Sequence, residues 1–249
     1  MPNISAIIPT LNEEAHIEQA IACLDWADEI IVVDSFSTDN TPAIARAHAN
    51  VRFIQHEYEN SAAQKNWITP QASFDWIFIL DADERVTPEL KKELIDFKEG
   101  NSPSHAAYWI KRQNFFLGKK LRYTWKGDAV IRLFDRRQSE YEKKAVHAEI
   151  KSSGSIGSLK GKLEHHTVLT MERYLEKMER YSQWSASDYE KKTGSIGFYH
   201  LRLKPAYRFF KHYILEGGIL DGKAGYVISK LMAHGVKRRY EIIKERRSL

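Results

Sequence analysis

Phe74-Asp75-Trp76-Ile77-Phe78-Ile79-Leu80-Asp81-Ala82-Asp83-Glu84 is an apolar run that ends in acidic residues. A run this short, rich in aromatic and β-branched residues, is typical of a buried strand in a parallel sheet. Asp81 and Asp83 follow the strand two residues apart, a spacing that places both carboxylates on one side of an extended chain. The pattern predicts a ligand site, because ligands of open α/β sheets bind beside the carboxyl ends of the strands.

The chemistry of these two carboxylates indicates a metal site. Hard oxygen ligands suit Mg²⁺ or Mn²⁺, which would in turn hold the phosphates of a nucleotide. The alternative is that Asp81 caps a turn and that Asp83 begins the loop before the next helix.

The preceding residues repeat the pattern of strand and helix. Ile4–Pro9, Glu29–Asp34 and Val51–Ile54 are short apolar runs, and the second of them also ends in Asp. Apolar residues recur at helical spacing from Ile17 to Leu24, and Thr41 with the following proline is expected to cap a further helix. This alternation predicts βαβ units with a parallel sheet, so both terminal aspartates are expected at one edge.

Composition predicts a protein of the cytoplasm. Cys23 is the single cysteine, so an internal disulfide is impossible and a reducing compartment fits. The N-terminus shows no signal-peptide pattern, and no apolar run reaches the length of a transmembrane helix. The net charge is +5, but residues 196–249 contain twelve Lys or Arg and four Asp or Glu and carry +8 by themselves.

This basic C-terminal segment also contains many aromatic residues. Leu201–Leu215 interleaves the two types, and Asp221–Arg247 is expected to form a second helix. Such helices lie in membrane interfaces, so an anionic membrane surface is the expected partner of residues 196–249. The alternatives are a helical cap with a solvated basic face and the interface of a homodimer.

Several motifs resemble those of a known family. The N-terminal ones are Pro9-Thr10-Leu11-Asn12-Glu13-Glu14, Val33-Asp34-Ser35-Phe36-Ser37-Thr38-Asp39-Asn40-Thr41, Gln64-Lys65-Asn66 and Leu80-Asp81-Ala82-Asp83-Glu84. In this order they resemble family 2 glycosyltransferases of the GT-A fold. The later ones are Ile131-Arg132-Leu133-Phe134, Ala145-Val146-His147, Tyr174-Leu175-Glu176-Lys177 and Ile219-Leu220-Asp221-Gly222. These are similar to the branch that includes lipopolysaccharide-core β-1,4-glucosyltransferases.

The resemblance implies an α/β fold, a Rossmann-like mixed sheet flanked by helices, with a C-terminal amphipathic helical extension. It implies that the enzyme transfers a hexose, with glucose as the first candidate, from a UDP-sugar with inversion. The acceptor would be a hydroxyl of a membrane-associated glycolipid or of the lipopolysaccharide core, and the cofactor Mg²⁺ or Mn²⁺. The enzyme would be peripheral on the inner face of the cytoplasmic membrane, with no nucleic acid as partner. The expected domains are a catalytic domain (1–165, with a nucleotide-binding half 1–100 and an acceptor half 101–165) and an extension (166–249).

The resemblance also assigns roles to the donor site. Pro9, Thr10 and Glu13 would hold the uridine, and Asp34 would accept a hydrogen bond from the uracil. Lys65 would be a counter-charge for phosphate. Asp81 would contact the ribose or the metal ion, and Asp83 would bind the metal ion that bridges the diphosphate.

An inverting displacement further needs a general base for the acceptor hydroxyl. Asp128 is the first candidate, because the branch usually carries an acid just before the strand that follows it. In many members a Glu directly follows the Val-His pair. Here Ala148 follows His147 and the acid comes one place later, at Glu149. In a strand, this shift would place the Glu149 carboxylate on the opposite face. His147 is expected to be a metal ligand or a structural histidine. Arg132 is expected to reach phosphate or to pair with a nearby acid.

Two other functions are compatible with parts of the sequence. A nucleotidyltransferase would use the same metal and diphosphate chemistry, but it would normally show a Gly-rich basic loop where Pro9–Glu13 stands. A non-enzymatic nucleic-acid-binding module would use the basic aromatic tail, but it would leave the terminal aspartates without a purpose.

Overall fold

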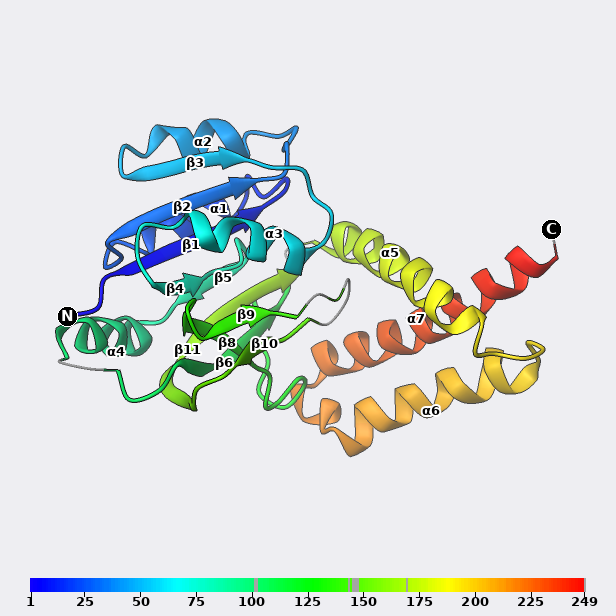
Figure 1. The fold of residues 1–249 in the computed structure, drawn as a ribbon. Coiled ribbons are helices and arrows are strands. Elements are labelled where there is room, and N and C mark those ends of the chain that lie inside the picture. The colour runs from blue at the N-terminus through cyan, green and yellow to red at the C-terminus, as the bar shows by residue number, and fades with distance from the viewer. Residues whose placement is uncertain (101–102, 143, 145–147, 169, 249) are drawn as a thin grey trace. The chain divides into compact units, whose positions relative to one another are not determined.

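The protein is described by a computed structural model that covers residues 1–100, 103–142, 144, 148–168 and 170–248 (Figure 1). Its residues divide into two compact units. The sheet unit comprises Met1–Gln113 and Gly127–His165, and the helical unit comprises Asn114–Lys126 and His166–Leu249. The functional halves and domain boundary expected from the sequence stay predictions.

A mixed sheet runs through the sheet unit. Its strands, in spatial order, are β3 (Val51–Gln55), β2 (Glu29–Asp34), β1 (Ile4–Thr10), β4 (Trp76–Ile79), β8 (Ala129–Asp135), β6 (Ala107–Phe116), β11 (Ile156–Val168) and β5 (Glu84–Val86). The first four are parallel, with Thr10 opposite Asp34 and Ile7 opposite Ile79. β8 lies antiparallel to both β4 and β6, and a short strand, β7 (Lys119–Lys120), pairs with β6. The predicted α/β sheet is therefore confirmed, with its parallel part at the N-terminus.

Helices cover the two faces of this sheet because its central strands are apolar on both sides. Ile4, Ala6 and Ile8 of β1 belong to one buried cluster, which α1 (Ile17–Ala22), α2 (Thr41–Ala47) and α4 (Pro88–Glu99) help to form. Ile7 belongs to the other, which is closed by α3 (Ser61–Ile68) and by the hairpin of β9 (Ser139–Tyr141) and β10 (Ile150–Ser152).

Two local expectations need correction. Thr41 is the first residue of α2 and does not cap it; Asn40 stands at the cap position, and the Thr41 hydroxyl accepts a hydrogen bond from the Glu13 backbone N–H at 2.8 Å. The stretch Ser152–Ser158 is rich in Gly and Ser, a composition that predicts a flexible loop, but β10 reaches Ser152 and β11 begins at Ile156, so the loop is limited to residues 153–155.

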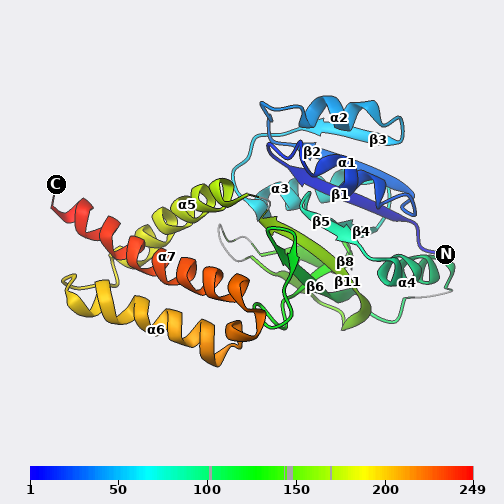
Figure 2. The same ribbon diagram turned by 180° about the vertical axis from the view of Figure 1, so that it is seen from behind.

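The helical unit consists mainly of α5 (Met171–Glu190), α6 (Lys204–Phe210) and α7 (Lys223–Arg247). α5 and α6 both pack along α7 (Figure 2). π-helical turns, Tyr199–Leu203 and Lys211–Leu215, extend α6 at both ends. The predicted C-terminal helical extension is confirmed. Within the described ranges, no helix combines the length and apolarity needed to cross a bilayer.

Asp221 anchors the turn into α7. Its buried carboxylate accepts backbone N–H hydrogen bonds from Arg122, Tyr123 and Thr124 at 2.9, 3.1 and 2.6 Å. Burial by itself would raise the pKa of Asp221, but these donors hold the pKa below its ordinary value. Gly225 then allows close packing of the turn, because a Cβ there would lie 1.8 Å from the Gly218 carbonyl oxygen.

Candidate active site

Two loops at the carboxyl edge of the parallel strands bind one another. The loop after β1 presents Asn12 in the left-handed region, with φ of 56°. The backbone N–H of Asn12 donates to the Ser37 hydroxyl at 2.8 Å, and the Asn12 amide oxygen accepts from the Thr38 N–H at 2.8 Å. Glu14 accepts from the Asn40 N–H at 3.0 Å. The motifs Pro9–Glu14 and Val33–Thr41 therefore form a single cross-linked rim.

Asp34 lies inside this rim with no solvent exposure. Its carboxylate accepts hydrogen bonds from the Ser37 N–H and the Gln55 side-chain amide, both at 3.0 Å. The neighbouring Thr10 hydroxyl is buried and has no hydrogen-bond partner in the part of the chain that is described. The uridine-binding roles of Pro9, Thr10, Glu13 and Asp34 stay predictions.

Each residue of the Gln64-Lys65-Asn66 motif on α3 holds a different segment. The Gln64 amide donates to the Ser35 hydroxyl at 2.6 Å. The Lys65 ammonium, 7% exposed, lies 2.9 Å from Asp81. The Asn66 side chain donates to the Tyr141 carbonyl and accepts from its N–H, at 2.9 and 3.0 Å. α3 thus joins the ends of β2 and β4 to the β9–β10 hairpin.

Buried side chains of opposite charge contact one another in a chain that begins at Lys65. Asp81 accepts from Lys65 with one carboxylate oxygen and from the Arg132 guanidinium with the other. Arg132, 4% exposed, also donates to Glu84 at 2.7 Å, and Glu84 has no solvent exposure. A second Glu84 oxygen accepts the Asp81 backbone N–H at 3.2 Å. The Asp-x-Asp-Glu turn is therefore stabilised by an arginine from β8.

The same alternation continues to Asp128. Arg112 lies 3.5 Å from Glu84 and donates to both Asp128 oxygens, at 2.9 and 2.8 Å. Such a two-pronged contact is among the strongest that a carboxylate makes. Among the described residues, these contacts link three positive and three negative side chains: Lys65, Asp81, Arg132, Glu84, Arg112 and Asp128.

This network shifts the pKa values of its members. Burial opposes ionisation of Asp81, yet the charges of Arg132 and Lys65 hold the pKa of this carboxyl well below its ordinary value. Burial likewise opposes the charge of Arg132, but Asp81 and Glu84 raise the pKa of its guanidinium well above its ordinary value. Asp81 and Arg132 therefore remain ionised at neutral pH.

Five of the predicted residues border one cavity of about 470 Å³: Lys65, Asp81, Asp128, Arg132 and Glu149. Trp109 and Tyr141 complete part of its wall. The Nε atom of Arg132 and the hydroxyl of Tyr141 are buried, with no hydrogen-bond partner among the described residues. A buried guanidinium with an unused donor favours an anionic ligand, because an unmade buried hydrogen bond costs free energy.

Asp83 contacts a histidine that the sequence analysis did not single out, and its predicted metal-binding role stays a prediction. One of its carboxylate oxygens lies 3.5 Å from Nε2 of His165, which β11 places opposite Glu84 of β5. The expected ligand His147 lies outside the described residues. Both oxygens of Asp81 contact cationic side chains, Lys65 and Arg132, and its predicted role as a ribose or metal contact stays a prediction. Over the described ranges, no group of three or more His, Cys, Asp or Glu side chains forms a metal site.

Asp83 and His165 nevertheless fit a divalent cation that takes its other ligands from elsewhere. Mg²⁺ and similar ions are commonly bound by one or two protein groups together with waters and substrate phosphates. His165 was missed from the sequence because nothing in its local pattern distinguishes it, and the pairing of β5 with β11 alone brings it to Asp83.

Arg85 is a second residue that sequence reasoning missed. Its guanidinium donates to the carbonyls of Ala82 and Glu84 at 2.7 and 2.6 Å, and to the carbonyl of His16 at 2.9 Å. Burial lowers its pKa somewhat. Arg85 thereby connects the turn that contains Asp83 with the residue that precedes α1, His16.

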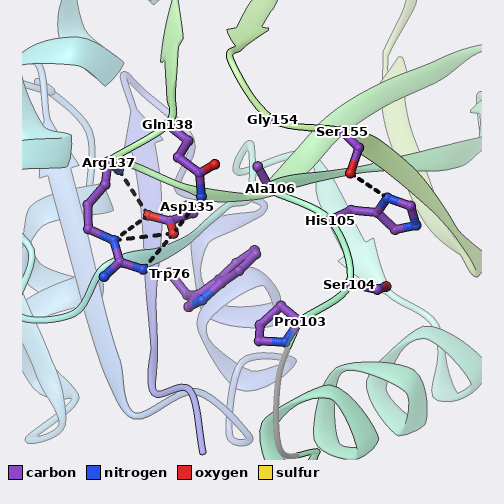
Figure 3. A pocket seen from close by; sticks show the side chains of 10 residues that line it. All are labelled: Trp76, Pro103, Ser104, His105, Ala106, Asp135, Arg137, Gln138, Gly154 and Ser155. Carbon is purple, nitrogen blue, oxygen red and sulfur yellow. Dashed lines mark hydrogen bonds and ion pairs between the residues drawn. The ribbon is translucent and has the colours of Figure 1, made fainter.

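A second cavity, of about 350 Å³, lies beside the amino end of β4 (Figure 3). Its polar side chains contact one another: Arg137 donates to Asp135 at 2.7 Å, and His105 lies 2.9 Å from the Ser155 hydroxyl. Among the described residues that line this cavity, no buried side-chain donor lacks a hydrogen-bond partner, in contrast to the first cavity.

Comparison with known proteins identifies the class to which this α/β protein belongs. Residues 5–153 match the family model described as glycosyl transferase family 2. The chain therefore belongs to this family of glycosyltransferases, enzymes that bind a nucleotide-sugar donor and an acceptor. This membership favours a glycosyltransferase over the nucleotidyltransferase and the non-enzymatic binding module.

Similar proteins span almost the whole chain. The lipopolysaccharide core biosynthesis glycosyltransferase LpsC of Rhizobium meliloti (strain 1021) is 28% identical over 96% of this chain and 93% of its own length. An uncharacterised glycosyltransferase of Rickettsia felis is 28% identical over 100% of this chain and 91% of its own. The predicted resemblance to a lipopolysaccharide-core branch is confirmed as a similarity to LpsC.

A solved structure confirms the predicted GT-A fold. The structure of S. aureus TarS 1–349 in complex with UDP has a TM-score of 0.50 to this chain and 16% sequence identity. The match covers 99% of this chain and 92% of the TarS chain.

Proposed function

We propose that this enzyme transfers a hexose, glucose first among them, from a UDP-sugar to a hydroxyl of a lipopolysaccharide-core or other glycolipid acceptor, with inversion. The cavity beside Lys65 and Arg132 carries the proposal, because it offers buried positive charge and an unused donor next to the Asp-x-Asp turn. The similarity to LpsC supports the acceptor class, and the UDP in the TarS structure supports the nucleotide.

The diphosphate of the donor would contact Lys65 and Arg132. Both side chains are buried and positively charged; they share the carboxylate of Asp81 as a partner, and Arg132 also contacts Glu84. Groups already held in place stabilise the charge of a leaving group without reorganising during the reaction. Asp83 and His165 would hold a divalent cation, Mg²⁺ or Mn²⁺, which when bound neutralises charge on the departing diphosphate.

Glu149 is the general base that the geometry favours. It is exposed and borders the same cavity as Lys65 and Arg132, and it precedes β10. Asp128 borders the cavity too, but Arg112 occupies both of its oxygens. A carboxylate held in this way is a weaker acceptor for a proton. Asp128 would then hold the Arg112 side chain in place at the wall of the cavity.

Titration calorimetry with UDP tests the donor. We expect the native protein to bind UDP when Mn²⁺ or Mg²⁺ is present and to bind GDP more weakly, because the rim around Thr10 and Asp34 would contact the base. Absence of UDP binding at every metal concentration would contradict the proposal.

The choice of base is tested by two isosteric substitutions. Glu149→Gln is expected to lower kcat by about 10²–10⁴-fold with unchanged UDP binding, because it removes the proton acceptor. Asp128→Asn is expected to lower kcat less and to reduce stability, because it weakens a charge-assisted contact with Arg112. Glu140→Gln, on the same hairpin and exposed, is the control. A larger kcat loss in Asp128→Asn with full stability would identify Asp128 as the base.

A further inference from the structure

The segment that contains α6 exposes an apolar stripe, which we name the α6 stripe. It consists of Tyr199, Leu203, Tyr207, Phe210, Ile214 and Leu215, and each of these side chains belongs to an exposed residue. Tyr199, Leu203, Tyr207, Phe210 and Ile214 recur every three or four residues, so they share one face of the helical segment, and Leu215 follows directly after Ile214. Tyr207 is 63% exposed and Phe210 50%.

The opposite face of the segment accounts for its packing within the helical unit. Pro205 and His212 are buried. The Phe209 and Tyr213 rings each contact Tyr226 of α7, with centroids 5.8 Å apart. The α6 stripe is therefore the outer face of a helix already anchored on its inner face, and an apolar surface of this extent marks an interaction site.

The charge around the stripe identifies the partner. From Lys191 through Leu215 the chain carries six Lys or Arg residues and no Asp or Glu. Arg202 is exposed and Arg208 half-buried beside the stripe, and Lys211, 43% exposed, lies 3.7 Å from Glu216 just beyond it. Aromatic residues combined with basic residues match the interface of an anionic bilayer, where rings lie at headgroup level and cations contact phosphates.

We propose that the α6 stripe docks the enzyme on an anionic lipid bilayer. A second copy of the chain fits the surface less well, because a two-fold contact would bring the same basic residues against one another. This docking does not depend on the nature of the donor. The α6 stripe would bring the enzyme to a lipid-linked acceptor.

Vesicle sedimentation of the full chain tests this docking. The probes are vesicles of phosphatidylglycerol mixed with phosphatidylethanolamine, compared with vesicles of phosphatidylcholine. We expect Tyr207→Ser with Phe210→Ser to weaken binding to anionic vesicles by at least about tenfold. The matched control is Tyr181→Ser with Trp184→Ser, two aromatic residues of α5 that are 47% and 48% exposed, and it should bind as the native protein does. Arg202→Gln with Arg208→Gln should weaken binding to anionic vesicles by about fivefold for each charge removed, and by less at high salt.

Three results would overturn the docking proposal. One is failure of the native protein to bind anionic vesicles, and another is equal binding by the stripe variant and its control. The third is a dimer in analytical ultracentrifugation that only the stripe variant dissociates. UDP titration of the same variants distinguishes membrane docking from donor binding. The stripe variant should bind UDP as the native protein does. If the native protein bound no UDP, its binding to anionic vesicles should still be observed.

Discussion

Arg132→Met is expected to lower the free energy of unfolding by about 3–5 kcal/mol, because it leaves buried carboxylates without their cation. Glu84 has no solvent exposure, and among the described residues the cation left to it is Arg112, at 3.5 Å, while the cation left to Asp81 is Lys65. Urea denaturation of the full chain measures the loss. Arg46→Met is the control: Arg46 is exposed, and its guanidinium lies 4.1 Å above the Phe53 ring, so the change should cost about 1 kcal/mol or less.

A double variant separates the loss of charge balance from the loss of packing. Glu84→Met combined with Arg132→Met removes one charge of each sign, so it should recover part of the stability lost in Arg132→Met alone. If Arg132→Met cost no more than Arg46→Met, the buried network would not hold the Asp-x-Asp turn in the way described.

The difference in stability between the native protein and Arg132→Met should become smaller in acid. Because the pKa of Asp81 is lowered in the folded protein, its contribution is present above the pKa of the unfolded chain, about 3.9, and is lost as pH falls towards the folded value. The stability gap between the native protein and Arg132→Met should therefore narrow below about pH 4. A gap that widened in acid would contradict this assignment.

Asp83→Ala is expected to reduce kcat/KM by about 10³-fold or more, about 4 kcal/mol of transition-state stabilisation. The carboxylate would hold the cation that neutralises the leaving diphosphate, and His165 alone is a weak site for such a hard ion. Calorimetry should show that metal no longer strengthens UDP binding. The Asp-x-Asp turn should persist, because Arg132 and Arg85 hold it through other atoms.

Asp75→Ala is the matched control for this variant. Asp75 precedes β4, whereas Asp83 follows it, and its side chain is 43% exposed beside Arg136. The control should keep both activity and the metal dependence of UDP binding. His165→Ala should show a smaller version of the Asp83→Ala phenotype. Full activity in Asp83→Ala would remove the metal site from this turn.

Helix spacing along α5 shows where prediction from the sequence alone reaches its limit. Its apolar stripe predicts a buried face, and Met171 and Tyr174 do pack in the core of the helical unit. Leu175 and Tyr181 are 45% and 47% exposed, contrary to that expectation. Periodicity establishes which residues share a face of a helix, whereas burial depends on what other segments cover that face.

The sequence by itself determined the parallel part of the sheet, the common edge reached by Asp34 and Asp81, and the family. Each depends on short-range patterns: apolar runs of strand length, helical spacing and motifs of adjacent residues. The tertiary structure alone decided the partners of the charged groups. Arg132 lies 51 residues from Asp81 in the chain, and His165 reaches Asp83 through the pairing of β5 with β11. Which cation neutralises which buried carboxylate is set by long-range strand order, and no local pattern encodes it.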